Sequence, residues 1–255
     1  MNLAAVPHDD WDKHWDDYAG TAASNPAQRL RRRLILDLLR LGDEPGRVLD
    51  IGCGQGDLIA DLRIAHPNAE LCGVDYSQWG IDIAAKKVPD ARFFSRDLLQ
   101  AGPPPEGLEG WATHAVCSEV LEHVDEPETL MRNAAAYLAP GSRLVVTVPG
   151  GPMSAFDRHI GHRRHFSPDS LAAVLTRAGF EVEKATGAGF PQFNVYRLLV
   201  IQRGRRLVQD VSSANSGVSS LTARAAMAVF RGLFALGTMQ NRWGWQVVAV
   251  ARMPC

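Results

Sequence analysis

Strand-like and helix-like segments alternate along the chain from residue 46 to residue 187. Short apolar stretches such as RVLDIG and AELCGVD are each followed by a segment whose apolar residues recur at helical spacing. This alternation predicts an α/β fold, in which helices cover both faces of an open, largely parallel, doubly wound sheet. A last apolar stretch, WQVVAVARM, supplies a seventh strand after a helical insertion.

Several helix boundaries can be predicted from local residues. Pro26 opens a helix that is expected to end at Gly42, and Gly179 stops a later one. The predicted N-caps are Ser77, Asp125 (with Glu128 completing a capping box) and Ser167. The helix after Asp125 is expected to run through APG at residues 139–141, with the next strand in SRLVVTVPG.

Composition excludes several classes of protein. The 255 residues carry a formal net charge of −1, which predicts no nucleic-acid partner and no membrane attachment. Arg29 to Arg33 form a basic cluster that we interpret as a solvated helix face. Four cysteines without CxxC spacing, three of them in apolar strands, favour a reducing cytoplasm. We expect a monomer or a homodimer.

Three parts are predicted along the chain. Residues 1–44 would form an amino-terminal helical cap, and residues 45–190 with 243–255 the core. Residues 191–242 would form a helical insertion or lid before the last strand.

The segment VLDIGCGQG, at residues 48–56, ends the first strand where ligands bind in doubly wound sheets. Its glycines follow G-x-G-x-G, with Asp57 where the dinucleotide fingerprint has its third glycine. Asp50 would repel a pyrophosphate and attract a cation. Asp75 ends the next strand, where a carboxylate can accept hydrogen bonds from ribose hydroxyls. A ligand with a ribose, a positive charge and no phosphate is therefore predicted, and S-adenosylmethionine has these features.

The chain resembles class I S-adenosylmethionine-dependent methyltransferases in VLDIGCGQG, GVDYS, FFSRDL and CSEVLEHV, which occur in order across roughly residues 45–187. The resemblance implies a Rossmann-like sheet of seven strands with the last antiparallel, and S-adenosylhomocysteine as product. The cofactor-binding residues that it implies are Trp15, Tyr18, Asp50, Gly52, Gly54, Gly56, Asp75, Tyr76, Ser77, Asp97, Leu98, Ser118 and Glu119. Alternatively, Asp97 caps a turn and Ser118 packs under the sheet.

The segment SEVLEHV is similar to the ubiquinone-biosynthesis O-methyltransferase branch of that family. In that branch, residues like Glu119, Glu122 and His123 are associated with a divalent cation. On a helical turn these three side chains would share one face, although Mg²⁺ prefers an all-oxygen ligand set. The favoured interpretation is an ionic turn without metal, with His123 as a base or a pocket wall.

The segment HIGHRRHFSPDSL follows the fifth strand. His162 or His165, or else His123, would be the general base that takes the acceptor's proton. Alternatively, Arg163 and Arg164, with His159, grip an anionic acceptor, or the arginines only hold the loop. A zinc site is disfavoured because no cysteine or acidic residue lies between these histidines in the sequence.

Two sets of apolar residues in and beside the insertion have rough helical spacing: Phe190, Phe193, Tyr196, Leu199 and Val200, and then Phe230, Leu233 and Phe234. These residues line an apolar acceptor pocket, or they pack the helices on one another or across a dimer. The predicted function is O-methylation of a small organic acceptor. The alternatives are N- or C-methylation, including that of a carboxylate- or phosphate-bearing acceptor, and S-adenosylmethionine binding without catalysis.

Overall fold

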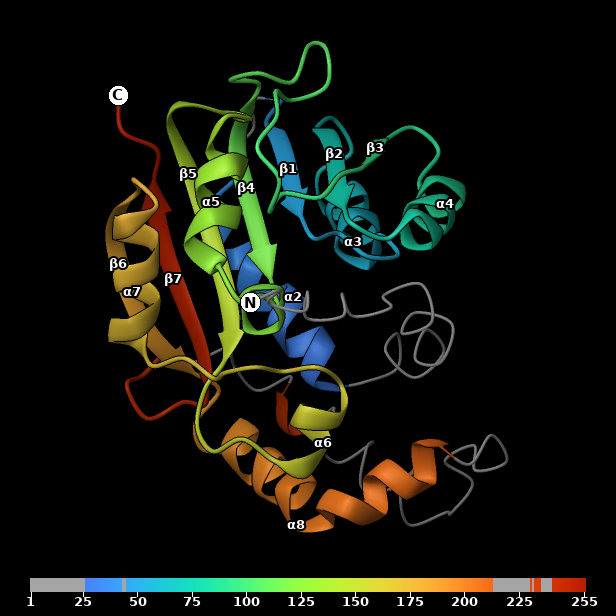
Figure 1. Cartoon of the computed structure of the whole chain (residues 1–255), viewed down its shortest axis with the longest axis vertical. Helices are drawn as coiled ribbons and strands as arrows, with labels where there is room; N and C mark the ends of the chain where they lie inside the picture. Colours follow the sequence, from blue (N-terminus) through green and yellow to red (C-terminus); the bar gives the residue numbers. More distant parts are fainter. Residues whose placement is uncertain (1–25, 43–44, 213–229, 231, 235–239) are drawn as a thin grey trace, which may run out of the picture.

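The computed structural model describes residues 26–42, 45–212, 230, 232–234 and 240–255. One sheet has its strands in the order β3-β2-β1-β4-β5-β7-β6 (Figure 1). The strands are β1 (Arg47–Ile51), β2 (Glu70–Asp75), β3 (Arg92–Ser95), β4 (Ala112–Ser118), β5 (Leu138–Pro149), β6 (Glu181–Ala188) and β7 (Gln246–Arg252). Strands β1 to β5 pair in parallel, while β7 is antiparallel to both β5 and β6. The predicted seven-stranded sheet with an antiparallel last strand is confirmed.

Helices cover both faces of this sheet, as predicted. The described helices are α2 (Pro26–Leu39), α3 (Asp57–Ala65), α4 (Gln78–Lys87), α5 (Pro127–Ala135), α6 (Ala155–His159), α7 (Pro168–Arg177) and α8 (Gln192–Ser212), with a 3-10 turn η1 at Leu121–His123. Helices α6 and α8 pack on each other beyond the ends of the strands (Figure 1). One buried cluster joins α2 and α3 to the sheet, and a second joins α5 and α7 to its other face.

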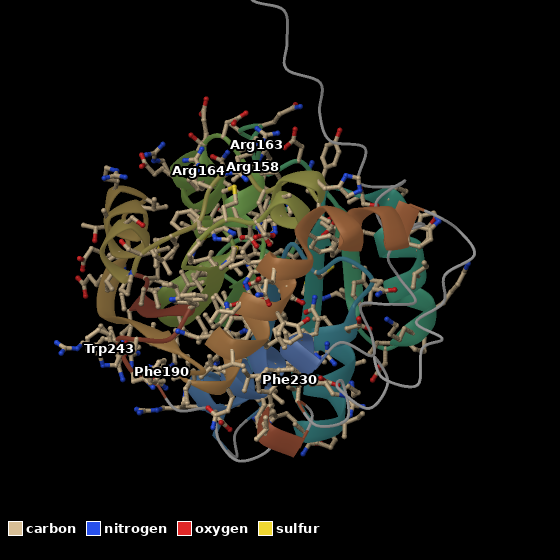
Figure 2. All side chains as sticks on the ribbon, turned by 90° about the horizontal axis from the view of Figure 1, so that it is seen from below. Arg158, Arg163, Arg164, Phe190, Phe230 and Trp243 are labelled. Atoms are coloured by element: carbon tan, nitrogen blue, oxygen red, sulfur yellow. The ribbon has the colours of Figure 1, made fainter. Side chains whose placement is uncertain are left out.

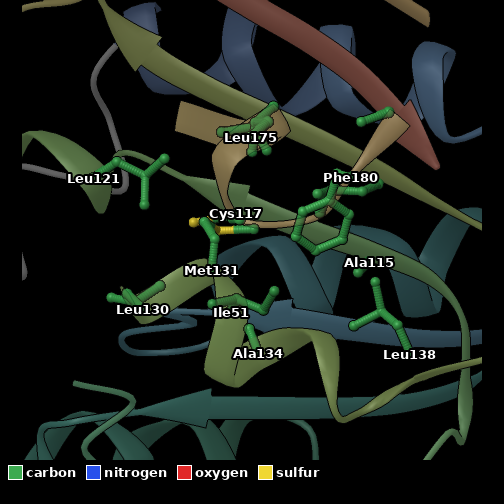
Figure 3. Packing of buried hydrophobic residues seen from close by; sticks show 14 of the residues in the cluster. Ile51, Ala115, Cys117, Leu121, Leu130, Met131, Ala134, Leu138, Leu175 and Phe180 are labelled. Carbon is green, nitrogen blue, oxygen red and sulfur yellow. The ribbon is translucent and has the colours of Figure 1, made fainter. Parts of the chain in front are cut away.

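Adjacent strand residues divide between these two clusters. Val116 and Val145 belong to the cluster with α2 and α3, whereas Cys117 and Val146 belong to the other. Figure 3 shows the second cluster, in which Met131 of α5 lies close to Cys117. Burial on both faces explains why the central strands are almost continuously apolar in the sequence.

Two of the three predicted N-caps are confirmed. The Ser77 hydroxyl accepts a hydrogen bond from the Gly80 amide, and Ser167 forms a capping box with Ser170. The prediction for Asp125 is wrong: α5 starts at Pro127 after Glu126, which makes no side-chain cap. The Asp125 carboxylate instead pairs with Arg163.

The predicted boundary between α5 and β5 is also wrong. Helix α5 ends at Ala135 and β5 begins at Leu138, inside the segment expected to be helical. Leu138 pairs with Ala112 of β4, and Pro140 cannot continue a helix. Helix α2 ends at Leu39 rather than at Gly42, because Arg40 adopts a left-handed backbone with φ 52°.

The described part of the insertion packs through aromatic rings. Phe193 and Tyr196 of α8 contact Phe230 and Phe234, and the cluster continues onto Leu30 of α2. This is the predicted packing of the two segments on one another.

Within the described ranges, no helix has both the length and the apolar character that a membrane span requires.

Candidate functional site

The loop after β1 has a backbone that only glycine tolerates. Gly52 and Gly56 both have φ 75°, in the left-handed region. A Cβ on Gly52 would lie 2.3 Å from Val120 Cγ2, and one on Gly56 would lie 2.9 Å from the Cβ of Ala84. The predicted glycine-rich turn is therefore fixed by both conformation and close approach, at the carboxyl end of β1 where the strand order reverses.

Asp75 organises that loop from the end of β2. One carboxylate oxygen accepts the Gly54 amide at 2.7 Å, and the other accepts the Ser77 amide at 2.8 Å. Asp75 thus connects the glycine loop to the start of α4, and we call residues 50–56 and 75–77 the glycine corner.

Asp50 is the second acidic group of the glycine corner. Its residue is only 3% exposed, and burial, followed by the charge of Asp75, raises the pKa of its carboxyl group to about 7. A nearby positive charge favours the ionised form of a carboxyl group whose pKa is raised in this way. The corner therefore suits a cationic ligand.

The other residues expected around the cofactor lie nearby in the fold. Asp97 accepts the Leu99 amide at 2.9 Å, which is the turn-capping arrangement. The Ser118 hydroxyl lies 2.9 Å from the Thr147 hydroxyl across β4 and β5. Tyr76 is 47% exposed beside Asp75. Ser77 is buried as the cap of α4, and Leu98 is partly buried against the core. Trp15 and Tyr18 lie outside the described residues.

Glu119 follows β4. The prediction that it shares a helical turn with Glu122 and His123 is wrong, because η1 begins only at Leu121. The backbone of Glu119 is left-handed, with φ 57°. Its carboxylate binds Arg31 Nη2 at 2.9 Å and accepts Gln246 Nε2 at 3.0 Å. The interpretation of the whole basic cluster as solvated is wrong for Arg31, which is only 8% exposed.

Glu122 lies in the 3-10 turn η1 and is fully buried. Neither carboxylate oxygen has a hydrogen-bond partner among the described residues. Burial, and then the charge of Glu119, raises the pKa of Glu122 well above its usual value. The nearest ring nitrogen of His123 lies 4.0 Å from Glu122 Oε1.

Three histidines converge beside Glu122. His162 Nδ1 lies 3.2 Å from His165 Nε2, and the His162 and His123 rings meet edge to face with centroids 4.7 Å apart. We call His123, His162 and His165 the histidine cluster. His159, which the sequence analysis grouped with Arg163 and Arg164, is exposed at the end of α6 and lies outside this cluster.

Hydrogen bonds fix the tautomers of His162 and His165. The Gly151 carbonyl can only accept, so His165 donates from Nδ1 over 3.0 Å. Neutral His165 then accepts at Nε2 from His162 Nδ1–H, which leaves a lone pair on His162 Nε2. Burial is the largest cause that lowers the pKa of His162, to about 4, so this imidazole is neutral near neutral pH.

Two residues that the sequence analysis missed support this cluster. Asp157 lies 3.8 Å from His165 Nε2, caps α6 with Ser154, and binds both Arg197 nitrogens at 2.7 and 3.0 Å. Burial alone would raise the pKa of Asp157, but Arg197 lowers it to about 2. No sequence motif pairs these residues, which lie on α6 and α8.

The arginines of the loop are already engaged. Arg163 pairs with the Asp125 carboxylate, and an Arg164 nitrogen donates to the Asp125 carbonyl at 3.0 Å. This favours the interpretation that they hold the loop. Figure 2 shows Arg158, Arg163 and Arg164 on one side of the molecule and Phe190 on the opposite side. Phe190 is 40% exposed.

Donor atoms for a metal ion occur in two described groups. The groups are Glu122 with His123 and His162, and Asp157 with His162 and His165, in each of which all donor atoms lie within 4.8 Å of one another. Glu119 belongs to neither group, so the predicted alternative of Glu119, Glu122 and His123 does not fit Mg²⁺.

Comparisons with known proteins agree with this architecture. Residues 26–185, more than half of the chain, match the family model described as a methyltransferase domain. The chain is 32% identical over 135 residues to the trans-aconitate 2-methyltransferase of Delftia acidovorans, covering 53% of this chain and 47% of that protein. It therefore spans about half the length of that relative.

Two further similarities cover more of the other protein. The ubiquinone biosynthesis O-methyltransferase of Marinobacter nauticus is 27% identical over 207 residues, which are 72% of this chain and 84% of that protein. A structure of Haemonchus contortus phosphoethanolamine N-methyltransferase 2 with S-adenosyl-L-methionine superposes with a TM-score of 0.63 and 15% identity, covering 100% of this chain and 62% of that one. At that identity the likeness shows the fold alone.

Proposed function

Because the chain belongs to the class I S-adenosylmethionine-dependent methyltransferases, we propose that it transfers a methyl group from S-adenosylmethionine to a hydroxyl oxygen of a small organic acceptor. The observation that carries the oxygen assignment is the lone pair on His162 Nε2, at the same edge of the sheet as the glycine corner. Transfer to oxygen requires a group that accepts the hydroxyl proton.

The glycine corner supports the cofactor assignment. Asp50 and Asp75 together favour a ligand with an ammonium group and a sulfonium. The Gly52 and Gly56 backbone can approach such a ligand because no Cβ is present. Asp75 holds the loop through two amides, and a carboxylate at this strand end can accept hydrogen bonds from ribose hydroxyls.

The methyl transfer balances as follows. A lone pair of the acceptor oxygen attacks the methyl carbon, and the carbon–sulfur bond breaks with its electrons going to sulfur, which yields S-adenosylhomocysteine. The acceptor oxygen then carries a positive charge and is strongly acidic. His162, although its pKa is about 4, is basic enough to accept that proton at Nε2. The carboxylate of Asp157 favours the resulting cation.

The roles proposed for the other predicted substrate-side residues are structural. Arg163 and Arg164 hold the histidine-bearing loop through Asp125, so an anionic acceptor is the second choice. Transfer to nitrogen or carbon, and binding of S-adenosylmethionine without catalysis, are the outcomes that the experiment must separate.

The test is an acceptor panel with isotopically labelled S-adenosylmethionine. The full chain is incubated with phenols, aliphatic alcohols, carboxylates and amines, and both S-adenosylhomocysteine and the methylated products are measured by mass spectrometry. We expect label on a hydroxyl oxygen of at least one small acceptor. Label only on nitrogen or carbon would overturn the oxygen assignment. Cofactor binding without transfer to any acceptor would favour the non-catalytic alternative.

A further inference from the structure

We propose that Glu122, His123 and His162 bind one first-row transition-metal dication of the Zn²⁺ type. This inference goes beyond the proposed function, and cation binding does not depend on which acceptor is methylated. It also differs from the cation site that the family resemblance implies, because the third donor is an imidazole from the loop after β5 rather than Glu119.

The donor atoms are close enough for one ion. One atom from each residue lies within 4.8 Å of the other two, and Glu122 Oε1 is 4.0 Å from His123 Nε2. Tetrahedral bonds of about 2.1 Å place donor atoms about 3.4 Å apart. Side-chain rotations that bring two donor atoms closer by at most about 1.4 Å close the difference. The Arg163 amide donates to the Glu122 carbonyl at 2.8 Å and so ties the two donor-bearing segments together.

The buried carboxylate of Glu122 indicates that a ligand binds here. The residue is 0% exposed, and both carboxylate oxygens lack a hydrogen-bond partner among the described residues. Buried polar groups are nearly always paired, because an unpaired one costs about 1–3 kcal/mol and an unpaired charge costs more. A bound cation beside these oxygens supplies the missing partner.

The donor chemistry selects the kind of cation. Mg²⁺ takes mainly oxygen ligands, and Glu119 is occupied by Arg31 and Gln246. One carboxylate and two imidazoles are the ligand types that Zn²⁺ and its neighbours accept, with a fourth position left open.

His165 prepares His162 for this role. Its hydrogen bond to Gly151 and its contact with His162 leave the His162 lone pair on Nε2. Second-shell partners of this kind fix the tautomer and ring orientation of metal-binding histidines. The alternative group at Asp157 is less suitable, since that carboxylate already accepts from Arg197 and from the Ser154 amide.

The charges around the site are balanced. Arg31 pairs with Glu119 and Arg197 pairs with Asp157, so neither guanidinium faces the site without an acidic partner. A cation and the acceptor's proton would use the same lone pair of His162. The ion-bound and proton-accepting states therefore exclude each other.

The test uses Co²⁺ as a spectroscopic probe. The full chain is treated with a chelator, dialysed, saturated with S-adenosylhomocysteine and titrated with Co²⁺, and the visible absorption bands are recorded. Zn²⁺ is then added as a competitor. We expect one equivalent of Co²⁺, with the intense bands of four- or five-coordinate cobalt, and its displacement by Zn²⁺. Absence of stoichiometric binding while S-adenosylhomocysteine still binds would overturn this inference alone.

Variants locate the ion. Glu122→Gln and His162→Ala should each weaken Co²⁺ binding by at least about 100-fold, the upper end of second-shell losses. His66→Ala should not change it, because His66 ends α3 and belongs to neither donor group. Equal affinity in Glu122→Gln and the parent would place the ion elsewhere and contradict the site.

If a variant fails to fold, imidazole ¹⁵N shifts of His123 and His162 in the parent protein must change on Zn²⁺ addition. Unchanged shifts would refute the proposal.

Discussion

Asp50 and Glu122 are buried carboxyl groups near the ends of the neighbouring strands β1 and β4, and their surroundings differ in an instructive way. For both, burial is the main cause that raises the pKa, and a second acid adds to it: Asp75 for Asp50, Glu119 for Glu122. The second acids differ. Asp75 is held by backbone amides of the glycine corner, whereas Glu119 is held by side chains from α2 and β7.

This difference separates two ways of building a site. The glycine corner gets its shape from short contiguous segments, and its two neighbouring acids, Asp50 and Asp75, favour a cationic ligand. The surroundings of Glu122 are assembled from α2, η1, the loop after β5, and β7. There the charge of Glu119 is already neutralised by Arg31, and Glu122 itself still lacks a partner among the described residues. Each variant below changes one of these two sides.

The largest effect is expected from His162→Ala. Removing the proton acceptor should lower turnover about 100- to 10,000-fold, the usual contribution of general acid–base catalysis. Affinity for S-adenosylhomocysteine should not change, because the glycine corner has no described hydrogen bond to His162. Steady-state kinetics and calorimetry on the same preparation measure both quantities. His66→Ala is the matched control, and a parallel loss of cofactor affinity in His162→Ala would show that the two sides are not separable.

Gly52→Ala should destabilise the fold by about 2–5 kcal/mol. A left-handed L-residue costs about 1–2 kcal/mol, and the overlap with Val120 adds about 1–3 kcal/mol. Because Val120 lies between Glu119 and η1, this contact also couples the two sides.

Val120→Ala removes the Cγ2 atom that a Cβ on Gly52 would meet. The Gly52→Ala/Val120→Ala double variant should therefore lose less stability in urea unfolding than the sum of the single variants. Strict additivity would mean that backbone conformation alone explains the glycine.

The glycine corner could be predicted from the sequence because its determinants are close together along the chain. Gly52, Gly54 and Gly56 alternate within five residues, and Asp75 ends the next apolar stretch. Ser77 was identifiable as a cap for the same reason. The sheet of seven strands with an antiparallel last strand followed from the family resemblance and was confirmed.

The side around Glu122 could not be predicted, because its partners meet only in the folded chain. Arg31 looked like one member of a solvated basic cluster, yet it pairs with Glu119, which lies on another element. Asp157 and Arg197 are 40 residues apart and share no motif. The helical-face prediction for Glu119, Glu122 and His123 assumed regular helix after β4, whereas the backbone turns left-handed at Glu119.

Asp75→Asn should weaken S-adenosylhomocysteine binding roughly 10- to 100-fold, since it removes charge-assisted hydrogen bonds worth about 1.5–3 kcal/mol. An asparagine nitrogen cannot accept the Gly54 or Ser77 amide, so the loop also loses a support. Isothermal calorimetry gives the affinity. Asp82→Asn, an exposed change on α4, is the control. If Asp75→Asn bound the cofactor as the parent does, the acidic corner would not be the ribose site.

The smallest effect is a pH dependence that belongs to Asp50. With a pKa of about 7 before cofactor binding, the ionised fraction rises from about a tenth at about pH 6 to about nine tenths at about pH 8. A cationic cofactor selects the ionised form, so affinity for S-adenosylhomocysteine should rise about 10-fold over this range, with proton release on binding. Calorimetry in buffers of different ionisation enthalpy measures that release. Asp50→Asn should show neither effect.

Stability should change in the opposite direction from affinity. The folded pKa of Asp50 lies above its ordinary value of 3.8, so between about pH 4 and about pH 7 the folded chain keeps a proton that the unfolded chain has lost. The contribution of Asp50 to the free energy of unfolding therefore falls as the pH rises through that window and is flat above it. Urea unfolding of the parent and Asp50→Asn at both ends of the window isolates this slope. Equal slopes in the parent and the variant would mean that Asp50 is ionised in the folded chain across this window, and the parallel between Asp50 and Glu122 would then be lost.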